Sequence, residues 1–199
     1  MGPRDLAAGK KNAARLKATI AFLDESGLLM APLVRRTWAP RGETPILRQR
    51  TRSRQKVSAA GVVTISPQRR RLGLYVALYP NANITAAVLV GFLRALRRHV
   101  RGPLILIWDR LATHRARSMK AFLDHCPQLR TVLLPPYAPE LNAVEYVWGY
   151  LKGGPLANHA PDDALELART AVRHARTIAG KQHLLRGFVH ATRLPLRLG

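Results

Sequence analysis

Apolar residues along the chain follow two periods, which predict strands alternating with helices. Short, nearly continuous apolar runs predict buried strands at 19–24, 57–65, 72–78, 103–109 and 130–134. Apolar positions at helical spacing predict a helix over 85–100, with Thr85 as its N-cap and Gly102-Pro103 as its stop. Further helices are predicted at 115–125 and from about residue 142. A separate helix is closed by Gly180, and a last short helix covers 181–192.

The order of these elements predicts an α/β fold. Two strands joined by a turn at 66–70 follow the first strand and predict an antiparallel start. Strands and helices then alternate, which is typical of a parallel sheet with right-handed crossovers. We therefore expect a mixed sheet of about five strands flanked by helices, and a hairpin-like excursion at Val34–Trp38 between prolines.

Three segments are expected along the chain. Residues 1–18 form a basic lead-in, residues 19–155 form the core, and residues 156–199 form a C-terminal helical segment that packs on the core. Acidic side chains (Asp162, Asp163 and Glu166) begin the helix that Gly180 closes, and basic ones lie near its end, which complements the helix dipole.

The charge balance predicts a polyanionic partner. The chain of 199 residues has 33 Lys and Arg against 11 Asp and Glu, a formal net charge of +22, and nucleic acid is the expected partner. An anionic membrane is the competing partner, but the chain has no amphipathic anchor, and no run approaches the roughly 18 apolar residues of a membrane span. The single cysteine, Cys126, and the lack of a signal-peptide h-region predict a soluble cytoplasmic protein.

Acidic residues are scarce, and three of them occupy positions that predict a shared site. Asp24 and Asp109 each follow an apolar strand, so both should emerge at the carboxyl end of the sheet. Glu145 flanks the apolar stripe of the helix that begins near Asn142, a stripe made of Leu141, Val144, Trp148 and Leu151.

Three converging carboxylates repel one another unless a cation lies between them. Oxygen ligands suit Mg²⁺ or Mn²⁺, and two such ions about 3.5–4 Å apart can activate water and stabilise a leaving oxygen in phosphodiester cleavage. Asp24, Asp109 and Glu145 are therefore the candidate catalytic and metal-binding residues. The histidine spacing contains no H-E-x-x-H pattern, which argues against a zinc hydrolase.

Structural roles are the alternative for each acid. Glu145 is also the N3 residue of an Asn142-x-x-Glu145 capping box, Asp24 with Glu25 can end a strand in a turn, and Asp109 can end its strand without any chemistry. Glu25 and Glu140 are secondary candidate carboxylates. They rank second because Glu25 should point to the opposite face of the sheet and Glu140 precedes the helix.

Basic residues suggest where nucleic acid binds. Five basic residues occupy every second position of one segment: Arg48, Arg50, Arg52, Arg54 and Lys56. If this segment is extended, their side chains lie on one side at a spacing of about 6.6 Å, which suits contact with a phosphate backbone. A solvated basic loop is the alternative. His114, followed by Arg115, either contacts the scissile phosphate or caps the next helix. Trp38 either packs on DNA sugars or anchors the hairpin.

The sequence from Thr19 onward resembles the transposases of bacterial insertion sequences related to mariner elements, the insertion sequence 630 group. Four segments carry the resemblance: 23–26 (Leu-Asp-Glu-Ser), 36–42 (Arg-Thr-Trp-Ala-Pro-Arg-Gly), 108–109 with 114–115, and 134–142 running into Glu145. The resemblance implies an RNase H-like DDE endonuclease in which Asp24, Asp109 and Glu145 bind two Mg²⁺ ions. The resemblance also implies that water first cleaves the element end and that the freed 3′-OH then attacks target DNA.

Two residues depart from the pattern of these transposases, and so does the start of the chain. Arg110 and Ala143 stand where many relatives have Asn and Pro. Relatives have helix-turn-helix modules before the first catalytic strand, whereas about eighteen residues precede it here, so we expect the catalytic half alone, with a separate helix-turn-helix product and a homodimer as possible partners. Another RNase H-like nuclease and a decayed, purely DNA-binding transposase are the rival functions.

Overall fold

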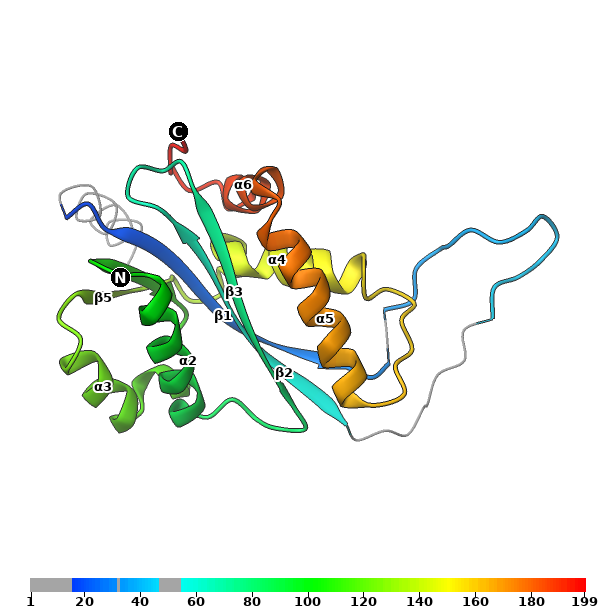
Figure 1. Cartoon of the computed structure of the whole chain (residues 1–199), viewed down its shortest axis with the longest axis horizontal. Helices are drawn as coiled ribbons and strands as arrows, with labels where there is room; N and C mark the ends of the chain where they lie inside the picture. The colour runs from blue at the N-terminus through cyan, green and yellow to red at the C-terminus, as the bar shows by residue number, and fades with distance from the viewer. Residues whose placement is uncertain (1–15, 32, 47–54) are drawn as a thin grey trace.

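A five-stranded mixed sheet forms the centre of the protein (Figure 1). The computed structural model describes residues 16–31, 33–46 and 55–199. The strands lie in the order β3-β2-β1-β4-β5, with β1, β2 and β3 antiparallel and β1, β4 and β5 parallel. This confirms the predicted α/β class and mixed sheet. The strands are β1 (Thr19–Leu29), β2 (Lys56–Ile65), β3 (Leu72–Pro80), β4 (Leu104–Trp108) and β5 (Leu129–Leu133).

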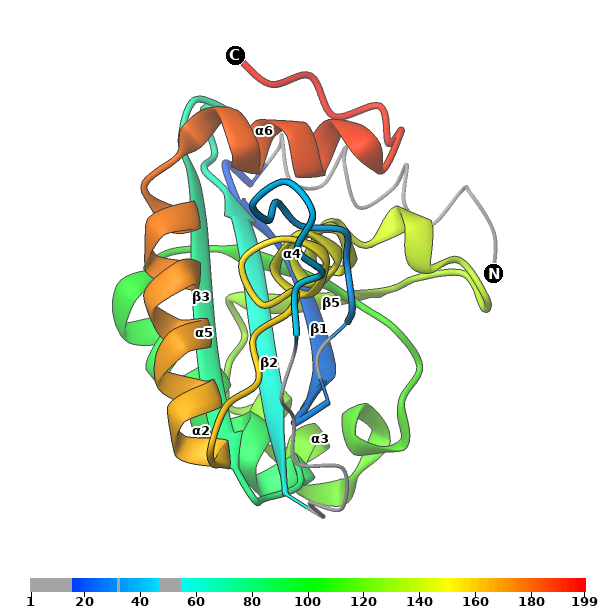
Figure 2. The ribbon, with the colours of Figure 1, turned by 90° about the vertical axis from the view of Figure 1, so that its right-hand side faces the viewer.

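Helices cover both faces of the sheet (Figures 1 and 2). One face carries α2 (Ala86–His99) and α3 (Arg117–Asp124), and the other carries α4 (Ala143–Gly153), α5 (Ala164–Ala179) and α6 (Gln182–Ala191). Thr85 caps α2 as predicted, because its side chain accepts a hydrogen bond of 3.3 Å from the Val88 amide. No helix in the described part of the chain has the length and apolar character needed to cross a membrane.

Successive side chains of each strand point to opposite faces of the sheet, which divides the core into two apolar layers. In β1, Ile20 and Phe22 join the layer under α4, α5 and α6, whereas Ala21 and Leu23 join the layer under α2 and α3. The helices α5 and α6 contribute buried residues to the first of these layers. The boundary at residue 155 stays a prediction, and the basic lead-in lies mostly outside the described residues.

Three predicted elements differ from the structure. The first strand continues to Leu29, because polar Glu25 and Ser26 still pair in register with β2, so Asp24 lies within β1 rather than at its end. Helix α3 begins at Arg117, after a 3-10 turn η1 (Ala112–Arg115). The predicted hairpin at Val34–Trp38 is wrong: residues 33–46 form an exposed, strand-free loop that extends away from the sheet (Figure 1).

Gly61 of β2 leaves room for the largest buried side chain of the core. A Cβ at this position would lie 2.7 Å from Trp148 Cζ2 and 3.0 Å from Val144 Cγ1, and Trp148 is only 1% exposed. We expect Gly61→Ala to destabilise the protein by about 1–3 kcal/mol, the usual effect of overpacking. Thermal unfolding of this variant and of Gly27→Ala measures the effect, since a Cβ at Gly27 meets no atom within 4 Å. Equal melting temperatures for the two variants would contradict the close packing.

Candidate active site of carboxylates

The register between two parallel strands brings the first two acids together. Phe22 of β1 lies opposite Ile107 of β4. Extending this register by two residues places Asp24 opposite Asp109, which directly follows the end of β4. Because β4 stops there while β1 continues, this end of the sheet is open, as is usual for sites at the carboxyl ends of parallel strands.

Asp24 has one carboxylate oxygen held by the protein. Its Oδ2 accepts a hydrogen bond of 2.9 Å from Trp148 Nε1, and the residue is 8% exposed. Burial, together with the negative charges of Glu145, Glu25 and Asp109, raises the pKa of Asp24 to about 8, although the Trp148 hydrogen bond lowers it. The nearby acids therefore act on Asp24 as a converging set of negative charges.

Asp109 is fixed in a similar way. Its Oδ1 accepts a hydrogen bond of 3.0 Å from the Leu111 amide and lies 3.1 Å from His114 Nδ1. Burial raises the pKa of Asp109, but the hydrogen bonds from His114 and Leu111 outweigh it, so the pKa lies below its ordinary value. In the described residues no hydrogen bond engages Oδ2 of Asp109 or Oδ1 of Asp24, so each carboxylate keeps one oxygen for a ligand.

The third acid, Glu145, comes from the first turn of α4. Asn142 caps this helix by accepting from the Val144 amide, and its Nδ2 donates 2.9 Å to the Leu23 carbonyl, which ties α4 to β1 beside Asp24. The capping bond goes to Val144 rather than to Glu145. The Glu145 side chain is exposed and, within the described ranges, forms no hydrogen bond or ion pair. Its carboxylate is therefore free to meet a ligand.

Asp24, Asp109 and Glu145 line one open cavity of about 360 Å³. The remaining wall is the loop between β5 and α4, which is rich in proline and includes Tyr137, a fully exposed residue with a left-handed φ of 56°. Arg110 and Asn142 also line the cavity. A concave site with three converging acids suits a hard divalent cation and a phosphate-bearing ligand.

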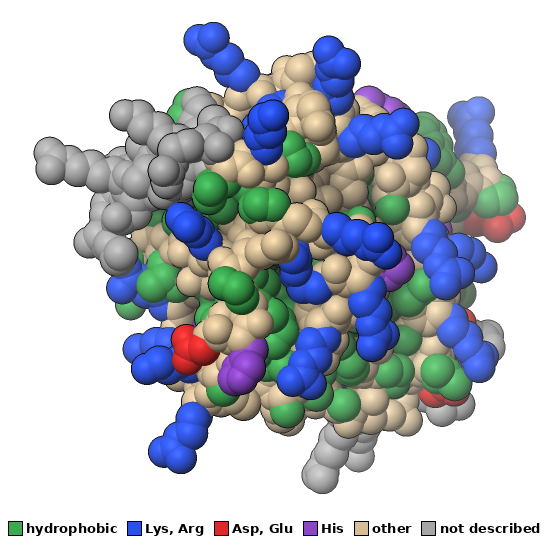
Figure 3. Space-filling model, turned by 60° about the vertical axis from the view of Figure 1, so that its left-hand side comes forward, with side chains coloured by type: hydrophobic (Ala, Val, Ile, Leu, Met, Phe, Trp, Pro, Cys, Tyr) green, Lys and Arg blue, Asp and Glu red, His purple; other side chains and the backbone are tan. Residues whose placement is uncertain are grey.

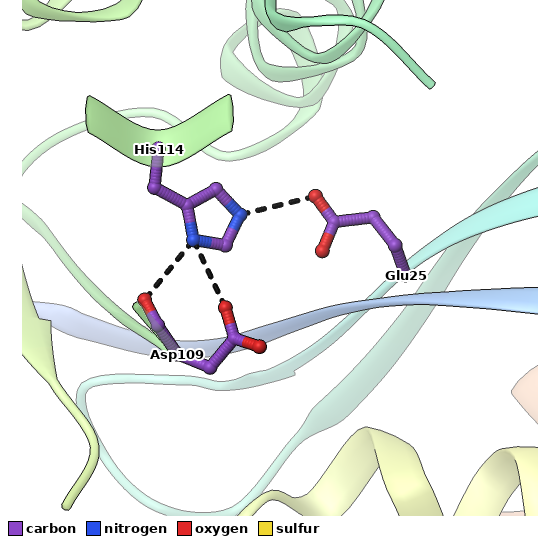
Figure 4. Close-up of side chains that lie close together, drawn as sticks. All are labelled: Glu25, Asp109 and His114. Atoms are coloured by element: carbon purple, nitrogen blue, oxygen red, sulfur yellow. Dashed lines mark hydrogen bonds and ion pairs between the residues drawn. The ribbon is translucent and has the colours of Figure 1, made fainter. Parts of the chain in front are cut away.

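His114 links Glu25 to Asp109 on the other side of the sheet (Figure 4). Its Nδ1 lies 3.0 Å from the Asp109 carbonyl oxygen, which only accepts, so Nδ1 is the donor. Its Nε2 lies 3.0 Å from Glu25 Oε1, and the ring stacks on Trp108 at a centroid distance of 4.2 Å. Burial lowers the pKa of His114, but the bonds to Asp109 and Glu25 outweigh it and raise the pKa to about 9. His114 is therefore a buried cation between two carboxylates.

Two sets of residues in this region have the composition of a metal site. Ligand atoms of Glu25, Asp109 and His114 all lie within 4.8 Å of one another, the only set of three that does so in the described residues. Asp24, Asp109 and Glu145 are spaced more widely around the cavity. The first set is already partly neutralised, because one His114 cation lies between the Glu25 and Asp109 carboxylates. The second has unneutralised charge and free oxygens, so it fits a divalent ion better.

Several other predicted site residues have defined positions. Glu140 is exposed and does not line the cavity, and Arg115 is exposed at the end of η1. Lys56 begins β2, where its Nζ lies 2.5 Å from Asn83 Oδ1. Trp38 is fully exposed, so it does not anchor a hairpin. The basic residues Arg48, Arg50, Arg52 and Arg54 lie outside the described residues.

The sequence did not reveal two contacts. The sequence predicts Trp148 in the apolar stripe of α4, but its indole N–H also donates a hydrogen bond to Asp24. A buried indole N–H needs an acceptor, and this requirement was the available signal. Glu25 does point away from Asp24 as expected, yet it reaches Asp109 through His114, a connection that sequence spacing alone does not contain.

We expect His114→Ala to lower stability and weaken the site together. The change leaves the Glu25 carboxylate, 11% exposed and with Oε2 already unpartnered, as an uncompensated buried charge, which typically costs about 3–5 kcal/mol. The His114 pKa is raised, so its stabilisation is complete below about pH 6.5 and is lost as pH rises through about 9.

Thermal unfolding as a function of pH measures the effect of His114→Ala, with exposed His183→Ala as the control. The double variant His114→Ala with Glu25→Ala should recover stability without recovering the orientation of Asp109. A pH profile of His114→Ala that parallels the wild-type profile would show that this pairing is absent.

A known protein family matches the part of the chain that contains these residues. The sequence profile of the family described as DDE superfamily endonuclease matches residues 19–168. A search of curated proteins found no match.

Among solved structures, the Mos1 mariner paired end complex with Mn is similar, with a TM-score of 0.61 and 18% identity over 97% of this chain and 60% of that chain. The Mos1 strand transfer complex gives 0.57 and 18% over 98% and 60%. The catalytic domain of Mos1 mariner transposase gives 0.52 and 15% over 99% and 98%. The chain thus spans about 60% of the length of the chains in the complexes, and the likeness confirms the RNase H-like fold.

Proposed function

Because the chain belongs to the DDE superfamily of endonucleases, we propose that it is the catalytic domain of a transposase, which cleaves DNA at transposon ends and joins them to target DNA. The catalytic residues of this proposal are Asp24, Asp109 and Glu145. The observation that carries it is their meeting in one cavity, with a free oxygen on each aspartate and a free carboxylate on Glu145.

The residues around the cavity have separate tasks in this proposal. Trp148 holds Asp24 from α4, while His114 and the Leu111 amide hold Asp109, so the two free oxygens keep fixed directions. Rigid positioning supplies much of the rate of an in-line phosphoryl transfer. Asn142 keeps α4, and with it Glu145, beside β1.

Asp24, Asp109 and Glu145 would hold two Mg²⁺ or Mn²⁺ ions. Bound there, such ions supply activation of the attacking water or 3′-OH and neutralisation of charge on the leaving oxygen. The raised pKa of Asp24 supports this assignment, because burial and three neighbouring acids disfavour its ionised form until positive charge is present.

Basic side chains supply the surface that holds DNA. Lys and Arg side chains are spread over the face in Figure 3, on which acidic side chains are few. With a net charge of +22, we expect DNA affinity to fall steeply with salt through release of counterions. A DNA-binding titration between about 50 and 200 mM salt should lose on the order of a thousandfold in affinity if at least six phosphates are contacted. A flat salt response would contradict phosphate tracking.

We assign the chain more finely to the bacterial insertion sequence 630 group, on the motifs at 23–26, 36–42 and 134–142. In that assignment it acts at the nucleoid, as a homodimer, with helix-turn-helix modules from a separate product to select the element end. The exposed loop at 33–46, which carries Arg35, Arg36, Trp38 and Arg41, is proposed to contact DNA.

One experiment separates the proposed activity from its rivals. Short terminal-repeat DNA is incubated with the protein and Mg²⁺, and nicked and strand-transfer products are resolved on a gel. Both products are expected, and EDTA should abolish both. Nicks without strand transfer would indicate another nuclease on this fold. Binding without any product at every Mg²⁺ and Mn²⁺ concentration would leave a DNA-binding protein.

A further inference from the structure

A second cavity, distant from the carboxylates in the sheet order, runs along the edge strand β3. This strand pairs with β2 on one side and has no strand neighbour on the other among the described residues. Figure 2 shows β3 at the margin of the sheet with α5 beside it. The cavity, about 350 Å³, lies between α2 and α5 and is lined by four consecutive β3 residues, 74–77.

The backbone N–H and C=O groups of every second β3 residue point away from β2, toward the open edge of the sheet. The side-chain amide of Gln182 pairs with both backbone groups of Leu72, accepting from its N–H at 3.0 Å and donating to its C=O at 2.8 Å. These groups therefore point away from β2. Since alternate residues of an antiparallel strand point the same way, Leu74, Val76 and Leu78 also direct their N–H and C=O groups outward. The Gln182 amide thus takes the place of a neighbouring strand at Leu72. The rest of the β3 edge presents backbone donors and acceptors with which an added strand could pair.

Both walls of this cavity, which we call the β3 slot, are apolar. Phe92, Ala95 and Leu96 of α2 form one wall, and Val172, Ala175 and Ala179 of α5 form the other. An extended segment on the β3 edge would direct alternate side chains into the two walls, as strands do. The slot therefore has the floor of a sheet edge and the sides of an apolar groove.

The charged groups around the slot are cationic. Arg176 of α5 is the charged side chain in its lining, and Arg173 lies one turn before Arg176. No acidic residue occurs in α2 or β3, and the one acid of α5, Glu166, lies in its first turn. An occupant with carboxylates beside its apolar residues would complement this rim.

We propose that the β3 slot binds an extended, acidic-flanked segment of a partner protein by strand addition. A ladder of alternating donors and acceptors matches a polypeptide backbone, whereas DNA phosphates only accept. A second copy of this chain would bring its own β3, which has no acidic residue, and a second cationic rim. The chemistry of the slot therefore favours an acidic partner.

The test uses a fluorescein-labelled probe peptide, Asp-Glu-Val-Ile-Val-Thr-Val-Glu-Asp, with the full-length chain near physiological salt. Binding is measured by fluorescence anisotropy, and amide hydrogen exchange is followed by NMR. The probe is expected to bind and to slow exchange at Leu74, Val76 and Leu78. A charge-reversed peptide with Lys and Arg at the ends should bind at least about tenfold more weakly, a difference of about 1.4 kcal/mol.

Two controls separate strand addition from attraction between a polycation and an anion. The same acidic peptide with N-methylated backbone keeps its charge but cannot complete the ladder, so it should lose binding. Arg176→Glu, an exposed substitution, should narrow or invert the preference between the two peptides. Val76→Pro removes one outward N–H and should weaken binding, with Val76→Thr as the matched variant that keeps it.

The proposal is overturned by any of three results. These are equal binding of the N-methylated and unmodified peptides, no binding of either charged peptide, or unchanged amide exchange at the three β3 positions. Protection of those amides that increases with protein concentration in the absence of peptide would assign the slot to a second copy instead.

Discussion

Replacing Asp109 with Asn is expected to abolish Mg²⁺-dependent DNA cleavage while leaving the fold in place. The amide oxygen of Asn can still accept from the Leu111 amide and from His114, so the local hydrogen bonds persist. The second carboxylate oxygen, however, is replaced by an amide NH2 group, which carries no negative charge and does not bind a metal ion. Removing even an outer partner of a metal site typically lowers activity or affinity by 10–100-fold, so loss of a direct ligand should exceed about a hundredfold.

Single-turnover nicking of labelled DNA measures this loss, with DNA affinity measured in parallel. The matched control is Asp124→Asn, since Asp124 is exposed at the end of α3 and lies outside the cavity. DNA binding should be equal in the two variants and cleavage should differ. Equal cleavage rates in Asp109→Asn, Asp124→Asn and wild type would remove Asp109 from the chemistry.

Replacing Asp24 with Asn is expected to make the metal-free protein more stable and, at the same time, inactive. Asp24 is buried, and its pKa is raised to about 8, above the ordinary value of 3.8. At neutral pH the unfolded chain has this carboxylate ionised, whereas the folded chain must keep its proton or tolerate a buried charge. Asn has neither requirement, and its amide oxygen can still accept from Trp148 Nε1. The wild-type residue thus lowers stability in favour of function.

The sign of the pH dependence follows from the raised pKa. Between about pH 4 and pH 8 the folded wild type binds one more proton at Asp24 than the unfolded chain, so its stability falls as pH rises through this window. Asp24→Asn has no carboxyl group at this position, so its stability lacks this dependence on pH. We expect Asp24→Asn to be more stable than wild type by roughly 4–6 kcal/mol at about pH 8, and by little near pH 4, because each unit of the pKa difference between folded and unfolded Asp24 corresponds to about 1.4 kcal/mol.

Calorimetry in EDTA across this pH range measures the difference. Added Mg²⁺ should raise the melting temperature of wild type and leave that of Asp24→Asn nearly unchanged, because a ligand stabilises only the protein that binds it. Asp162→Asn is a suitable control, since Asp162 is an exposed acid far from the cavity in sequence. A melting temperature of Asp24→Asn below that of wild type at pH 8 would contradict the unfavourable burial of this carboxylate.

Sequence patterns predicted the sheet because each strand carries its own local signal. The apolar run that forms β4 is buried along its whole length, and Thr85 caps α2 as its position indicated. Helix α5 likewise ends at Gly180, as expected from glycine after a helical pattern. These features depend on neighbours in the chain, which is why periodicity and capping preferences were sufficient.

The parts that were predicted wrongly or missed depend on contacts between distant residues. Asp24 lies within β1 because β2 continues to pair with the polar residues after it, which no local pattern of β1 indicates. The bond between His114 and Glu25 joins residues 89 positions apart in the chain. The Val34–Trp38 segment has strand-like residues but no neighbouring strand in the described chain, so its exposed apolar side chains stay outside the sheet.

The most direct test of the carboxylate site is to locate bound metal. Crystals of the protein grown with Mn²⁺, and with terminal-repeat DNA where it co-crystallises, would give anomalous difference density for the ion. The account predicts density in the cavity, in contact with the free oxygens of Asp24 and Asp109 and with Glu145, while His114 stays paired with Glu25. Density coordinated by His114 Nε2 and Glu25, with none beside Asp24, would contradict it.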